Sequence, residues 1–88
     1  MRLVLVEWVD SYGCSSSWTS IGDPLPQPRV MRCRSVGWLA HDGEECKVLI
    51  PHVGEVGDGE SDQGCGDMTI PTRAVLRMLD LKTLVEAL

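Results

Sequence analysis

The chain has 88 residues, 43% of them hydrophobic and 24% charged. This length fits a single domain, residues 1–88, and excludes two-domain nucleotide enzymes and α/β barrels. Eight Lys and Arg residues stand against thirteen Asp and Glu, for a formal net charge of −5. An acidic chain is a poor general binder of nucleic acid, because affinity there comes mostly from neutralising phosphates.

The first half of the chain predicts two strands joined by a long loop. Residues 2–9 are rich in Val, Leu and Trp and form a nearly continuous apolar run, which is typical of a strand covered on both faces. Residues 11–28 predict a long loop, since they combine Gly, a run of Ser and three prolines at alternate positions. Residues 29–40 predict a second, longer strand.

The second half predicts three further strands. Residues 45–52 form the third, after an Asp-Gly hairpin turn at Asp42 and Gly43. Residues 53–67 hold five acids, five glycines and no base, and predict a long solvated loop. Residues 68–71 predict a short fourth strand, and a tight turn after Pro71 leads to the fifth, residues 75–79.

Five short strands, one clear hairpin and little helix predict a mainly β fold. We expect a small, five-stranded, strongly bent antiparallel sheet or barrel. Residues 82–88 would form a short helix or a frayed tail. The main alternative is an open sheet in which residues 72–88 form a helix capped by Thr72.

The N-terminal apolar run bears on location. Glu7 and Asp10 interrupt it early, so we expect neither a signal peptide nor a membrane span, and a cytoplasmic protein. Without export, the four cysteines are expected to be free thiols rather than two disulfides. They are Cys14, Cys33, Cys46 and Cys65.

Three segments carry a resemblance: VEWVDSYG (6–13) followed by Trp18, RSVGWLAHDGEECKVLIPH (34–52) and MTIPTRAVLRMLDL (68–81). Together they resemble small uncharacterised proteins encoded by phages and prophages. The closing strand, turn and I-P-x-x-x-V pattern also resembles the end of Sm-like and SH3-like barrels, although Sm-like proteins usually begin with a helix. The first resemblance implies a phage-encoded protein that acts in the host cytoplasm.

The few aromatic residues are the first candidates for a site. Trp8 and Trp38 lie within predicted strands and are expected to fill the core. Trp18 lies in the Ser-rich loop, where it either stacks on a flat ligand or closes one end of a barrel. Tyr12, at the start of the same loop, is a further candidate for the ligand site.

Arginines supply the candidate anion site. Arg32 and Arg34 share one face of the second strand by two-residue alternation, and two guanidinium groups on one face can grip a phosphate or a carboxylate. The alternative is that they pair with acids of a neighbouring strand. Arg73, after the turn at Pro71, is a third candidate.

The Ser-rich loop could add hydrogen-bond donors to the same site. Its hydroxyl and backbone N–H groups lie next to Gly13, and such loops can cradle an anion. The alternative is a merely solvated loop. The candidates are Ser15, Ser16 and Ser17.

No cofactor, metal or catalytic group is expected. Asp58, Glu60 and Asp62 alternate like the start of a calcium loop, but Gln63 and Thr69 stand where its glycine and bidentate glutamate belong. No C-x-x-C pair points to zinc. No nucleophile is placed beside a base, so we do not expect an enzyme.

These features predict a non-enzymatic, homo-oligomeric protein that binds a small anionic or nucleotide-like ligand where the Trp18 loop meets the Arg32 and Arg34 face. The phage resemblance extends this to sequestration of a nucleotide-derived host immune signal. One alternative is a protein-binding module that inhibits a host protein through a sheet edge or through the acidic loop as a mimic of nucleic acid. The other is a structural virion accessory protein.

Overall fold

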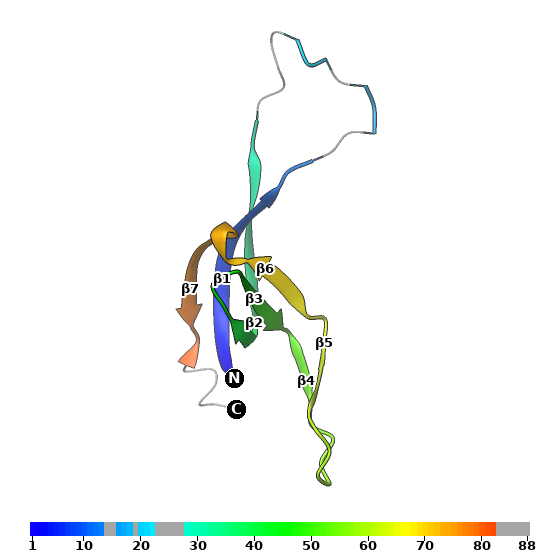
Figure 1. Ribbon diagram of the computed structural model, residues 1–88, viewed down its shortest axis with the longest axis vertical. Coiled ribbons are helices and arrows are strands. Elements are labelled where there is room, and N and C mark those ends of the chain that lie inside the picture. The colour runs from blue at the N-terminus through cyan, green and yellow to red at the C-terminus, as the bar shows by residue number, and fades with distance from the viewer. Residues whose placement is uncertain (14–15, 19, 23–27, 83–88) are drawn as a thin grey trace.

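The computed structural model describes residues 1–13, 16–18, 20–22 and 28–82. In this part of the chain no helix has the length and apolar character needed to cross a membrane. The elements in chain order are β1 (Arg2–Ser11), β2 (Val30–Asp42), β3 (Cys46–Ile50), β4 (His52–Gly54), β5 (Gln63–Cys65), β6 (Met68–Pro71), a 3₁₀ turn η1 (Thr72–Ala74) and β7 (Val75–Asp80) (Figure 1).

Five strands form one antiparallel sheet in the order β6-β3-β2-β1-β7, and β4 pairs with β5 in a separate two-stranded sheet. The prediction of a mainly β fold with a five-stranded antiparallel sheet is confirmed. Of the two predicted forms, sheet or barrel, the structure has the sheet, which is not closed: β6 and β7 are its two edges. Pro71 lacks a backbone N–H, and η1 carries the chain from one edge to the other instead of letting β6 pair with β7.

The C-terminal part settles the helical alternative for residues 72–80. They form η1 and β7 rather than an α-helix, since Val75 and Met78 pack against the core and β7 pairs with β1. The predicted helix or tail over 82–88 lies outside the described residues except for Lys82. The Asp-Gly hairpin is confirmed: β2 ends at Asp42, and the N–H of Gly43 donates to the carbonyl of Cys46 at 3.0 Å.

The core lies on the inner face of the bent sheet. Alternation along β1 turns Val4 and Val6 inward, where both are fully buried, and leaves Leu3 and Leu5 half-buried on the outer face. The prediction that this strand is covered on both faces is therefore wrong for the single chain. Among the described residues, the buried hydrophobic side chains are Val4, Val6, Leu39, Leu49 and Ile70.

Two tryptophans of the sheet lie on opposite faces. Trp8 packs against the core, as predicted, and its Nε1 donates a hydrogen bond to Ser35 Oγ at 3.0 Å. Trp38 does not belong to the core, contrary to the prediction. Its neighbour Leu39 is buried, so alternation turns Trp38 to the outer face, opposite Leu3 in register.

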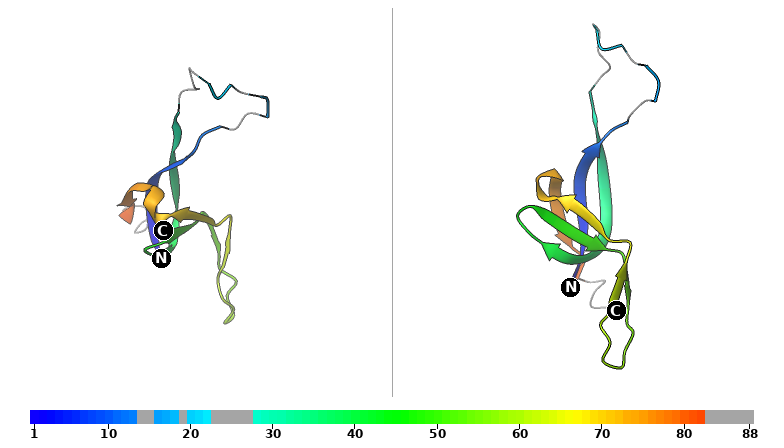
Figure 2. Two further views of the ribbon diagram at one scale, coloured as in Figure 1. Left: turned by 45° about the horizontal axis from the view of Figure 1, so that its top comes forward. Right: turned by 45° about the vertical axis from the view of Figure 1, so that its right-hand side comes forward.

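The acidic segment is more ordered than predicted. His52, Val53 and Gly54 pair with Cys65, Gly64 and Gln63 in the β4–β5 hairpin. Its tip turns through three successive positive-φ residues, Gly57, Asp58 and Gly59, and the N–H of Glu60 donates to Gly57 O at 2.9 Å. Figure 2 shows the hairpin projecting from the sheet at the end opposite to the β1–β2 connection.

Candidate functional site

A row of charged side chains crosses the outer face of the sheet. Glu7 on β1 lies between Arg34 on β2 and Arg77 on β7 in register. Arg77 donates to the Glu7 carboxylate through Nε at 2.9 Å and Nη2 at 3.1 Å, while Arg34 Nε lies 3.4 Å from the same group. Pairing of Arg34 with an acid of the neighbouring strand, one of the two sequence-based alternatives, is thus observed.

Arg32 is placed differently. It lies two residues from Arg34 on β2, opposite Val9, and among the described residues it has no carboxylate partner. The two arginines do border one hollow of about 380 Å³, together with Glu7, Cys33 and Leu76. Arg34 and Arg77 share the carboxylate of Glu7, and Arg32 has none, so among the described residues two of these three positive charges are left uncompensated.

Glu7 holds this arrangement together. The hydrogen bond from Arg77 lowers the pKa of its carboxyl below the ordinary value of 4.5, and the charges of Arg77 and Arg34 act in the same direction against partial desolvation. Glu7 therefore remains ionised at neutral pH. It also links β1 to both neighbouring strands.

We expect this linkage to appear in the acid stability of the protein. As the pH falls through 4.5, Glu7 takes up a proton in the unfolded chain before it does so in the folded chain. The stability that ionised Glu7 contributes above this pH is therefore lost as the pH drops through the lower pKa of Glu7 in the folded chain. Glu7→Gln should flatten this part of the profile and lower Tm by a few degrees at pH 7.

Thermal melts between pH 7 and 3 measure this effect. Glu44→Gln is the matched control, since Glu44 lies exposed in the β2–β3 turn and makes no ion pair with a described residue. Equal profiles for wild type and Glu7→Gln would contradict a stabilising role of the carboxylate.

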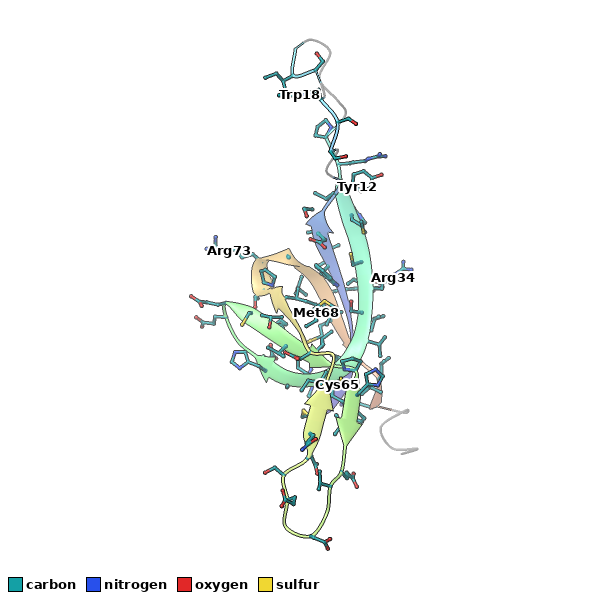
Figure 3. All side chains as sticks on the ribbon, turned by 90° about the vertical axis from the view of Figure 1, so that its right-hand side faces the viewer. Tyr12, Trp18, Arg34, Cys65, Met68 and Arg73 are labelled. Carbon is teal, nitrogen blue, oxygen red and sulfur yellow. The ribbon has the colours of Figure 1, made fainter. Side chains whose placement is uncertain are left out.

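Trp18 lies far from the arginine hollow in the single chain. Its side chain is fully exposed, and Figure 3 places it near the outer end of the β1–β2 connection, well separated from Arg34. It therefore does not close an end of the sheet. Ser16 and Ser17 are exposed in the same segment, and Ser15 lies outside the described residues.

Tyr12 and Arg73 also lie apart from the hollow's lining. The Tyr12 ring has the guanidinium of Arg29 4.0 Å from its centroid, so that a cation–π contact joins the two sides of the β1–β2 connection at its base. Arg73 is exposed on η1 and, in Figure 3, extends on the opposite side of the molecule from Arg34. Of the predicted site residues that the structure describes, only Arg32 and Arg34 border the same hollow.

Sequence reasoning missed several residues of the outer face. Glu7 was visible as a lone carboxylate inside an apolar strand, and β-alternation would have assigned Arg77 to a strand face. Trp38 borders a second hollow of about 370 Å³. Its other lining residues are Met1, Val53 and Glu55.

Thiols and carboxylates do not form a metal centre in the described part of the chain. No three His, Cys, Asp or Glu side chains are grouped there in a way that would hold a metal ion. Cys33, Cys46 and Cys65 are free thiols, and Cys14 lies outside the described residues.

The arginine hollow lies on one face of a chain that is acidic overall. Comparison with models of known protein families, with curated proteins and with solved structures finds no match to this chain.

Proposed function

We propose that the protein is a non-enzymatic binding protein that takes a small anion in the hollow bordered by Arg32 and Arg34. The supporting observation is the exposed guanidinium of Arg32, which has an apolar residue opposite it in register and no carboxylate partner among the described residues. Hydrogen bonds between guanidinium groups and a phosphate or carboxylate are charge-assisted and are among the stronger polar contacts.

The shape of the hollow favours an anion that also carries an apolar part. Leu76 offers an exposed apolar side chain next to the arginines. A phosphate-bearing nucleotide derivative has this combination. On the phage resemblance, we propose that such a ligand is a nucleotide-derived host immune signal, which the protein would remove by binding it.

Calorimetric titration with inorganic phosphate, cyclic nucleotides and ADP-ribose tests the proposal. Loss of one charge-assisted contact is worth about 1.5–3 kcal/mol, so Arg32→Ala should weaken binding by roughly 10- to 150-fold. Binding should also weaken as salt is raised, because screening reduces the charge contribution. Arg73→Ala is the matched control, since it removes an equally exposed arginine that lies outside the hollow.

No heat from any of these compounds at high micromolar protein would remove the small-ligand function. Equal weakening by Arg32→Ala and Arg73→Ala would mean that only the general charge of the protein matters. The protein-binding function would then be favoured, through the exposed acids of the β4–β5 hairpin. Its tip carries Glu55, Asp58, Glu60 and Asp62, all exposed.

A further inference from the structure

The outer face of the sheet carries an apolar row beside the charged one. Leu5 on β1 lies opposite Val36 on β2 and Leu79 on β7. Val36 is 52% exposed and Leu79 is 40% exposed. The next row continues the apolar surface with Leu3 opposite Trp38. Nothing else in the described chain covers the side chains of Val36, on the central strand β2, and Leu79, on the edge strand β7.

The whole chain, with its projecting β4–β5 hairpin, exposes more surface than a compact monomer of its mass. The chain exposes 7234 Å², whereas a compact monomer of 9.7 kDa exposes about 5,100 Å². Its radius of gyration is 17.8 Å, against about 12 Å for a compact chain of this length. The excess of about 2,000 Å² is larger than the roughly 800 Å² that each partner contributes to a standard stable interface.

The charge distribution allows two copies to meet on this face although each chain has a net charge of −5. Glu7 is the one carboxylate in the charged row, and both Arg34 and Arg77 contact it. The five acids of residues 53–67 belong to the β4–β5 hairpin and the segment that follows it. Glu55 of that hairpin borders the hollow beside Trp38, on the other side of the apolar row from Arg34 and Arg77. A two-fold contact through the apolar row therefore sets the positively charged row of one copy beside the Glu55 end of the other.

We propose that a second copy of this chain packs on the outer face, so that the row formed by Leu5, Val36 and Leu79 meets the same row of the partner across a two-fold axis. Such an interface uses one patch on both subunits and closes as a dimer. The two sheets would stack about 10 Å apart. The apolar row forms the centre, and the Arg34–Glu7–Arg77 row forms a polar rim. The inference does not depend on the anion site.

Light scattering and sedimentation equilibrium of the full chain test the dimer. At micromolar concentration the wild type should have about twice the monomer mass of 9.7 kDa. Val36→Glu places a charge in the centre of the row and should weaken association at least 100-fold. Leu79→Glu should do the same from the neighbouring strand. Val56→Glu is the matched control, because Val56 is 50% exposed and lies in the hairpin loop.

Far-UV circular dichroism checks that each variant is folded. Val36→Thr, which keeps the shape of the side chain, decides the case if the glutamate variants unfold, and it should weaken association about 10-fold. A wild type that stays monomeric at 100 µM overturns the proposal. So does a dimer that persists in folded Val36→Glu and Leu79→Glu, an unweakened Val36→Thr dimer, or equal dissociation by Val56→Glu.

Discussion

Leu49→Ala is expected to be one of the most destabilising single substitutions in this protein. Leu49 lies on β3, is 2% exposed and belongs to a core cluster of five buried hydrophobic side chains within the described part of the chain. Truncation of a buried leucine costs about 2–5 kcal/mol, because it loses apolar burial and leaves a cavity. Proteins of this size are stable by only about 4–13 kcal/mol, so this one substitution would remove a large share of the total.

Thermal unfolding followed by circular dichroism measures the effect, and Tm should fall by about 10–30 °C. Leu76→Ala is the matched control. Leu76 is 53% exposed, so the same truncation there should change stability by no more than about 0.5 kcal/mol. Similar melting temperatures for the two variants would show that the core does not depend on Leu49.

Gly37→Val is expected to have the next largest effect, for the opposite reason. A Cβ atom on Gly37 would lie 3.2 Å from Leu49 Cβ and 3.2 Å from the backbone oxygen of Ile50. Both neighbours belong to β3 and cannot move without shifting that strand. Because Gly37 has no side chain, β3 can pass close to the backbone of β2 at this position. Overpacking at such a position costs about 1–3 kcal/mol.

The measurement is the urea midpoint of unfolding, which should fall clearly for Gly37→Val with the slope unchanged. Gly54→Val provides the control within another strand, because a Cβ there meets only Gln63 O at 3.9 Å. An unchanged midpoint for Gly37→Val would mean that β3 can move away from β2 without loss of stability.

Much of the sheet was predictable because its strands are apolar runs bounded by strong turn signals. Asp42 and Gly43 separate two such runs, and Pro71 ends β6. The β4–β5 hairpin was not predictable in this way, since its strands contain His, Gly, Gln and Cys and have no apolar pattern. The two strands are joined by a tight turn of positive-φ residues. The numbers of acids and glycines in this segment do not predict that turn.

The candidate site was predictable in part. Two-residue alternation puts Arg32 and Arg34 on one face of β2, and both border the same hollow. The distance between Trp18 and these arginines depends on the path of the connection between β1 and β2, which residue types alone do not determine. Openness of the sheet likewise depends on η1, whose three residues separate the two edge strands.

The projecting β4–β5 hairpin affects how this protein will move through solution. The molecule measures 63 × 25 × 24 Å, so its friction exceeds that of a sphere of equal mass. On a gel-filtration column calibrated with compact standards, even a single subunit will elute early, at the position of a heavier protein. The number of subunits inferred from an elution volume would therefore be too high, and only a method that measures mass independently of hydrodynamic radius will give the true number.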